Sequence, residues 1–199
     1  MKHVPIWTAA ALLAVALAWQ PAALAQPKFS IKPVAQKKLN QLPAGALYWQ
    51  VETFPTFAEA QAATGSTSLA AEVAGKAWLF TLGPKGGATA GGTKVAEIGP
   101  VPAIAASEYL LRVNYTGGAP GAKTPVHTHP GSEAFFVLTG RLGQKTSGGV
   151  SHVESGKTMN GHGADTPMEV FSSGTTDLNA LVMFVVDANK PFSTPARLH

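Results

Sequence analysis

The sequence predicts an all-β fold, either a sandwich or a barrel. From residue 94 onward, short apolar or alternating segments are separated by turns containing Gly or Pro, the pattern expected of short antiparallel strands. Glycine and proline contribute 21 and 15 of the 199 residues, which suits a fold with many turns. Hydrophobic residues make up 45% of the chain and charged residues 13%, so there is ample material for a core.

Residues 1–25 have the layout of a secretory signal peptide. Lys2 opens a short basic start, and an apolar run from Ile6 to Trp19 follows. This run is shorter than the roughly 20 residues that span a bilayer. The small residues of Ala23-Leu24-Ala25 then form a cleavage site before Gln26. We expect cleavage after Ala25, a periplasmic or secreted protein, and no stable membrane anchor.

The region of residues 26–106 is expected to be an N-terminal extension that packs on a barrel formed by residues 107–199. Residues 26–45 read as a polar lead-in without periodicity. Thr56, followed three residues later by Glu59, has the pattern of a capping box and starts a short helix over residues 56–64. Residues 68–74 would extend this helix or form a further turn.

The remaining segments read as strands joined by turns. The Gly-rich residues 83–92 lack the pattern of a phosphate-binding loop and are expected to form a flexible connection. The predicted strands cover residues 47–54, 78–82, 94–98, 108–115, 125–129, 133–139, 141–145, 151–154, 157–159, 168–171 and 178–187.

The composition argues against a metal site with cysteine ligands and against a nucleic-acid partner. The chain has no cysteine, so any metal must be held by His, carboxylate or carbonyl ligands. The net charge of +4 is spread thinly, without a basic run or a stripe of interleaved aromatic residues, so we expect no nucleic-acid partner.

The pattern His127-Thr128-His129, followed by Glu133, indicates a metal site. Side chains two residues apart on a strand point to one face, so the two imidazoles would project together. The turn over residues 130–132 would bring Glu133 back beside them. Apolar residues follow Glu133, and a carboxylate at the start of a buried strand requires a partner such as a metal ion.

At this point the sequence resembles the cupin superfamily. The spacing Gly121-x5-His127-x-His129-x3-Glu133-x6-Gly140 matches every fixed position of the first cupin motif. The resemblance implies a jelly-roll barrel, with His127, His129 and Glu133 as ligands of a divalent transition metal (iron, manganese, zinc, nickel or copper). It also implies that the two glycines form the flanking turns.

The second cupin motif begins at Gly156 and then departs from the family pattern. Counting without gaps places Pro167 at the position of the family's fourth ligand, a histidine, whereas anchoring on the later turn places Met168 there. Either way this histidine is absent. Met168 itself is a candidate fourth ligand, since its soft sulfur suits copper better than manganese or iron. Otherwise the site would keep three ligands with open positions, or gain a replacement from His162, Asp165 or Glu169, or have lost its metal altogether.

The expected activity is that of a metal-dependent enzyme acting on a small molecule, of the dioxygenase, isomerase or lyase type that the resemblance implies. The alternative is a non-catalytic module that binds a metal or a small ligand, and a homodimer is left open. An enzyme would need an acid or base, for which the candidates are Glu133, His162, Asp165 and Glu169. Arg112, on a predicted strand, is expected to face solvent rather than clamp an anionic substrate.

The signal-peptide pattern of residues 1–25 predicts that the exported protein has a cleaved N-terminus. N-terminal sequencing of the exported protein is expected to begin at Gln26, because signal peptidase cleaves after a small-x-small site. Intact Met1 on a soluble cytoplasmic product would contradict the assignment.

Overall fold

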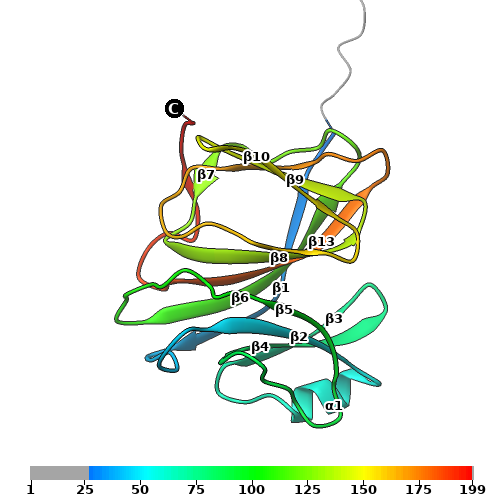
Figure 1. The fold of residues 1–199 in the computed structure, drawn as a ribbon, viewed down its shortest axis with the longest axis vertical. Helices are drawn as coiled ribbons and strands as arrows, with labels where there is room; N and C mark the ends of the chain where they lie inside the picture. The colour runs from blue at the N-terminus through cyan, green and yellow to red at the C-terminus, as the bar shows by residue number, and fades with distance from the viewer. Residues whose placement is uncertain (1–26, 199) are drawn as a thin grey trace, which may run out of the picture.

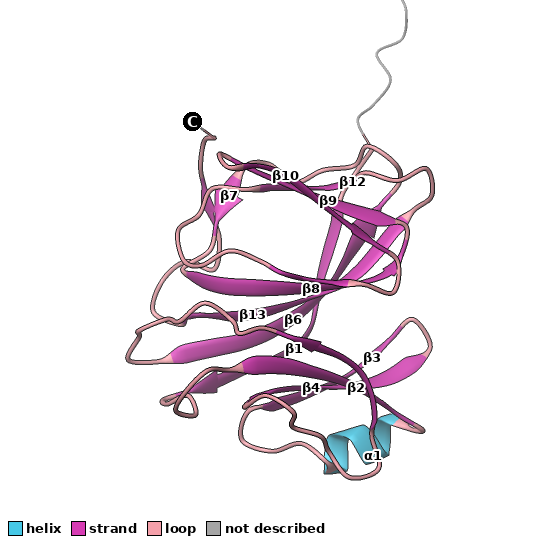
Figure 2. Cartoon of the chain, in the orientation of Figure 1, coloured by secondary structure: helices cyan, strands magenta, loops and turns pink. Residues whose placement is uncertain are grey.

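A computed structural model describes residues 27–198, which form an all-β fold with one short helix (Figures 1 and 2). The predicted fold class is therefore confirmed. The expected signal peptide, residues 1–25, lies outside the described residues. The elements are β1 (Ser30–Leu39), β2 (Tyr48–Phe54), α1 (Phe57–Ala62), β3 (Ser68–Val73), β4 (Lys76–Gly83), β5 (Thr93–Ile98), β6 (Tyr109–Gly118), β7 (His127–Thr128), β8 (Gly131–Thr139), β9 (Arg141–Thr146), β10 (Gly149–Glu154), β11 (Thr158–Asn160), β12 (Glu169–Ser172), β13 (Leu178–Asp187) and β14 (Thr194–Pro195).

The strands are arranged in three layers (Figure 1). A four-stranded sheet with the order β3-β4-β2-β5 carries α1 and forms the lower layer of the view. A five-stranded sheet, β1-β6-β13-β8-β11, forms the middle layer. The small sheets β10-β9-β12 and β14-β7 form the upper layer, and with the middle sheet they build the barrel.

The three central strands of the middle sheet, β6, β13 and β8, are buried on both faces. Along β13, Leu181 and Met183 belong to the core shared with the four-stranded sheet, whereas Val182 and Phe184 belong to the core inside the barrel. The same alternation holds on β8, where Phe136 packs outward and Phe135 inward. Because successive side chains point to opposite faces, a continuous apolar run serves two cores at once.

Two N-terminal segments differ from the sequence prediction. The lead-in contains β1, a ten-residue edge strand that pairs antiparallel with β6. Most of its side chains are exposed, which explains the polar composition that hid the strand. Residues 68–73 form β3, not a helix or turn, because they pair with β4 along their whole length. The barrel sheet thus includes a strand that precedes residue 107, while the domain boundary itself stays a prediction.

The capped helix and the turns at the two glycines of the first motif follow the prediction. Thr56 accepts a hydrogen bond from the Glu59 N–H (3.2 Å) and donates its hydroxyl proton to the Glu59 carboxylate (2.8 Å). Gly121 and Gly140 both adopt positive φ, +83° and +72°, as turn residues. Over residues 27–198, the structure contains no helix with the length and apolarity needed to cross a membrane.

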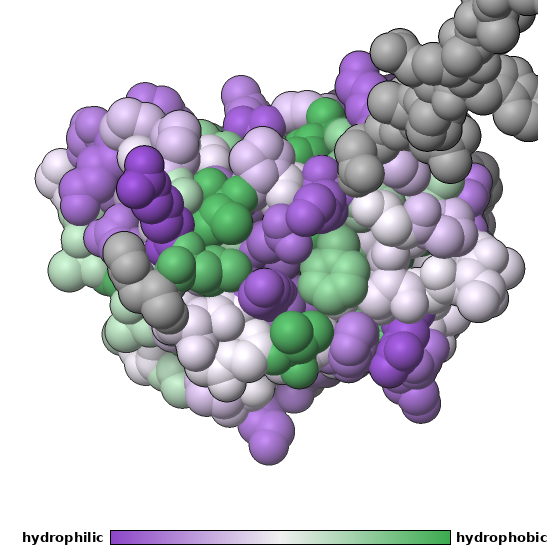
Figure 3. Space-filling view, turned by 90° about the horizontal axis from the view of Figure 1, so that it is seen from above, coloured by the Kyte–Doolittle hydropathy of each residue, from purple (hydrophilic) through white to green (hydrophobic). Residues whose placement is uncertain are grey.

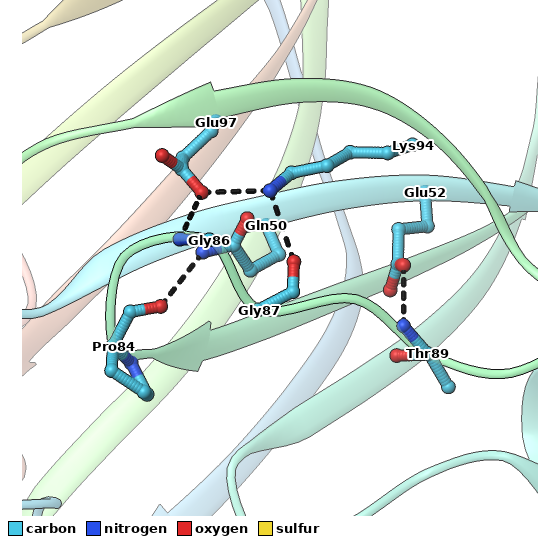
Figure 4. Close-up of polar contacts among 8 residues, drawn as sticks. All are labelled: Gln50, Glu52, Pro84, Gly86, Gly87, Thr89, Lys94 and Glu97. Carbon is cyan, nitrogen blue, oxygen red and sulfur yellow. Dashed lines mark hydrogen bonds and ion pairs between the residues drawn. The ribbon is translucent and has the colours of Figure 1, made fainter.

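Carboxylates of the neighbouring strands hold the glycine-rich connection between β4 and β5 against the four-stranded sheet (Figure 4). Glu97 accepts hydrogen bonds from the Gly86 N–H (2.8 Å) and from Lys94 Nζ (2.7 Å), and these contacts lower the pKa of its carboxyl to about 2. The buried Glu52 accepts one from the Thr89 N–H (2.7 Å). This segment is therefore a structural connection, and the N–H groups of Gly86 and Thr89 are used within the protein.

Leu181 tests the packing between the middle and four-stranded sheets. It is fully buried, so Leu181→Ala should leave a cavity and lower the free energy of unfolding by about 2 to 5 kcal/mol. Chemical denaturation followed by far-UV circular dichroism measures this. Val150→Ala is the control, because Val150 is 50% exposed and should change stability by no more than about 0.5 kcal/mol. Equal effects would show that this interface does not support the fold.

Candidate functional site

A cavity of about 410 Å³ lies inside the barrel. Its lining comes from the inner face of the middle sheet, from β12, from the segment before β8 and from the C-terminal segment around β14. The outer face seen from above in Figure 3 is mixed, with small hydrophobic patches among hydrophilic residues. The lining residues are Phe29, Ile31, Arg112, Asn114, Thr116, Thr124, Pro125, Val126, His127, His129, Glu133, Phe135, Val170, Val182, Phe184, Phe192, Ser193 and Pro195.

The structure brings His127 and His129 together at this cavity. Their ring centroids lie 4.9 Å apart and the ring planes are inclined by 84°. Backbone hydrogen bonds between His127 and Met168, both 2.9 Å, hold the strand from one side. From the other side, β14 pairs with β7. The joint projection predicted from the i, i+2 spacing is thus present.

Each histidine has one ring nitrogen bound to a backbone carbonyl. His127 Nδ1 lies 2.8 Å from the Pro125 oxygen, and His129 Nδ1 lies 2.6 Å from the Phe192 oxygen. Because a carbonyl oxygen only accepts, each Nδ1 carries the proton and each Nε2 keeps a free lone pair. Burial lowers the pKa of His129 to about 4, although the Phe192 carbonyl opposes this shift. His129 is therefore neutral at pH 7.

Glu133 lines the same cavity, but its carboxyl group is hydrogen-bonded to Gln144. Its side chain is buried, and one carboxyl oxygen accepts a hydrogen bond from Gln144 Nε2. That amide nitrogen also contacts Met168 Sδ at 3.3 Å. Burial raises the pKa of the Glu133 carboxyl to about 8, and the Gln144 hydrogen bond opposes the rise. Gly161 closes over it, since a Cβ there would lie 2.6 Å from Glu133 Cγ.

The donor set fits a metal ion in part. Metal-binding histidines usually donate their other ring N–H to a carbonyl or carboxylate, as both imidazoles do here. Within the part of the chain that the structure describes, however, no group of three or more His, Asp and Glu side chains lies close enough to hold one ion. The histidine pair thus suits a divalent transition metal, while Glu133 does not join it in this structure.

Other predicted site residues lie outside the lining of the cavity. Met168 is buried beside the site, where its sulfur contacts Gln144. Glu169 forms an ion pair with Lys123 at 3.1 Å. His162 and Asp165 lie in the segment between β11 and β12, and the Asp165 backbone N–H donates to the His129 carbonyl (2.8 Å). Among the described residues, the structure groups none of His162, Asp165 and Glu169 with the histidine pair.

The expectation that Arg112 faces solvent is wrong, because its side chain lines the cavity. It lies on β6 between Leu111 and Val113, which pack against the four-stranded sheet. Arg112 and Asn114 therefore share the opposite face and line the cavity. The sequence of this strand shows the alternation of apolar and polar residues. Such alternation usually indicates that the polar face is solvated. In this barrel the polar face lines the cavity instead.

The C-terminal segment supplies site residues that the sequence analysis missed. The Phe192 ring packs on the rings of His129 and Phe184, with centroids 4.8 and 4.9 Å away. Its carbonyl oxygen fixes the proton on His129, as described above. β14 has only two residues, too few for a periodic pattern, so the only signal was the isolated aromatic residue.

No protein-family model and no curated protein matches the sequence. Solved structures overlap with part of it. A cupin-like protein from Thermotoga maritima is 16% identical, with 43% of this chain and 64% of that chain covered (TM-score 0.39). The DMSP lyase DddQ from Ruegeria pomeroyi is 21% identical, with 43% of each chain covered (TM-score 0.38). A Klebsiella pneumoniae protein with a double-stranded β-helix domain is 21% identical, with 44% and 75% covered (TM-score 0.38).

These overlaps reach only part of each protein. The chain spans 43% of the length of the lyase and 64% of the length of the cupin-like protein.

The raised pKa of Glu133 predicts a pH-dependent stability. Between its ordinary pKa of 4.5 and the folded value of about 8, the folded state holds a proton that the unfolded state has lost. Stability from this group therefore falls as pH rises. His129 acts oppositely and only between about pH 4 and 6.5, so the range from 6.5 to 8 isolates Glu133.

We expect the free energy of unfolding of the chelator-treated protein to fall by about 1 kcal/mol per pH unit over that range, relative to Glu133→Gln. The variant keeps an oxygen acceptor for Gln144 and cannot titrate. Urea denaturation at several pH values measures the difference. Glu154→Gln, whose side chain is 66% exposed, is the control. Parallel profiles for the wild type and Glu133→Gln would contradict the assignment.

Proposed function

We propose that this chain is an exported, cupin-type barrel protein that binds a divalent transition metal at His127 and His129 and acts on a small molecule in the adjoining cavity. One observation supports it above the others. Both imidazoles donate Nδ1–H to backbone carbonyls, which leaves two Nε2 lone pairs on side chains that line one cavity. Histidines that bind a metal usually donate their other ring N–H to a carbonyl or carboxylate in this way.

The residues around the pair have distinct tasks in this proposal. The bound metal would supply Lewis-acid chemistry, polarising a ligand at its open positions. Phe192 and Pro125 orient the imidazoles through their carbonyl groups. The apolar walls around Phe135 and Phe184 exclude water from the bound molecule. Glu133, in the same lining, is the candidate for holding or moving a proton at the ligand.

A second candidate function is a non-catalytic binder of a small molecule or metal. One observation favours it: Gln144 holds the Glu133 carboxyl, so no third His, Asp or Glu side chain joins the pair among the described residues. The enzyme proposal covers the dioxygenase, isomerase and lyase types, with iron, manganese, zinc, nickel or copper as the metal.

Metal content tests the proposal. Purified wild-type protein should carry up to one divalent metal per chain by elemental analysis, and the double variant His127→Ala, His129→Ala should lose it while circular dichroism shows an unchanged fold. His152→Ala is the matched control, since His152 is exposed on β10 and contacts Ser173 instead (3.0 Å). Equal metal content in the wild type and the double variant would remove the proposal.

Metal retention in two further variants tests the position of the missing fourth ligand. Met168→His should strengthen metal retention against a chelator if a side chain at this position reaches the ion, because a further imidazole adds a ligand. If His162 already fills that position, His162→Ala should release the metal instead. Unchanged retention in both variants would show that this segment does not approach the ion, and would favour the non-catalytic binder.

A further inference from the structure

Arg112 brings a positive charge into the barrel cavity. Its neighbours there come from several elements: Asn114 on its own strand β6, Phe184 on β13, and Phe192 in the C-terminal segment. Among residues 27–198, the one carboxyl group in the lining is that of Glu133, which is hydrogen-bonded to Gln144. This part of the chain therefore gives the guanidinium group in the cavity no dedicated counter-ion.

The hydrogen bonding of Arg112 is incomplete within residues 27–198. Its Nε donates to Asn114 Oδ1 at 2.8 Å, and in this part of the chain no carboxylate lies within ion-pair distance of the guanidinium. The two terminal nitrogens form no hydrogen bond to described protein atoms. Because guanidinium carries five N–H donors, four of them remain for another partner.

The guanidinium is also held in place. Its central carbon lies 4.1 Å from the centroid of the Phe192 ring, a cation–π arrangement. This contact and the Asn114 hydrogen bond restrict the side chain before any ligand arrives. A restricted guanidinium with both terminal nitrogens free is suited to a planar, two-oxygen acceptor, which it binds through two parallel hydrogen bonds.

The rest of the cavity is mainly apolar. A volume of about 410 Å³ suits a small organic molecule. Placing an arginine among such walls without a partner is unfavourable, because burial weakens its hydration. Burial accordingly lowers the pKa of Arg112 from its ordinary value. The apolar wall residues are Phe29, Ile31, Val126, Phe135, Val170, Val182, Phe184 and Phe192.

We propose that the cavity binds a small organic acid, with its carboxylate on the terminal nitrogens of Arg112 and its apolar body against the aromatic and aliphatic walls. This deepens the proposed function and rests on the part of it that places a small molecule in the cavity. Arg112 and His129 both contact the Phe192 ring, so the acid would lie beside the histidine pair.

Calorimetric titration with phenylacetate and its neutral counterpart phenylacetamide tests this proposal. The wild type should bind the acid at least about 10-fold more tightly, since a bidentate charge-assisted pair is lost with the amide. Arg112→Gln should abolish this preference, and Arg112→Lys should keep only part of it because an ammonium group lacks the fork. Arg141→Gln is the matched control, because Arg141 pairs with Glu154 (2.8 Å) outside the cavity lining.

Several outcomes would overturn the inference. These are an unchanged preference in Arg112→Gln, no preference in the wild type, or no binding of the acid at all. Inorganic phosphate binding as tightly as phenylacetate would also overturn it, because the apolar walls would then contribute nothing. Should Arg112→Gln fail to fold, Arg112→Lys and the comparison of the two probes still decide the matter.

Metal analysis of the same variants separates this inference from the proposed function. If Arg112→Gln keeps its metal but loses the preference for the acid, both stand. If the metal is present and the acid is not preferred, the inference fails and the metal proposal stands. If the wild type binds no metal but prefers the acid through Arg112, the inference stands and only the metal proposal fails.

Discussion

The burial of three central strands on both faces is the constraint on which this structure depends. β6, β13 and β8 each send alternate side chains to the four-stranded sheet and to the barrel interior. A register slip of one residue would exchange the two faces. It would turn Arg112 and Glu133 toward the apolar core around Leu111 and Phe136, where neither has a polar partner. The same alternation that builds two cores therefore also places the polar groups of the cavity.

The site shows how a polar cluster is supported inside such a barrel. The polar side chains at its centre have partners: the imidazoles have backbone carbonyls, Glu133 has Gln144, and Arg112 has Asn114. The Nε2 atoms and the terminal nitrogens of the guanidinium form no hydrogen bond with the described residues. These free groups, rather than the satisfied ones, define what the cavity can bind.

Much of the fold and part of the site could be predicted from the sequence. The regular alternation and turn residues were enough for the strands from β5 to β13. The spacing of His127 and His129 was enough to place the pair together. β1 was missed because an exposed edge strand lacks an apolar face, and Arg112 was placed outward because the sequence does not show which side of a strand faces a cavity. The Glu133–Gln144 contact depends on β9 lying across the barrel, which local patterns do not encode.

The segment that follows β13 has a consequence for how the protein would respond to cleavage. Phe192, whose carbonyl group orients His129 and whose ring supports Arg112, lies in the connection between β13 and β14. The buried members of both cores all precede this connection. Proteolysis between β13 and Phe192 would therefore keep the strands of both cores and detach the group that orients one of the two histidines.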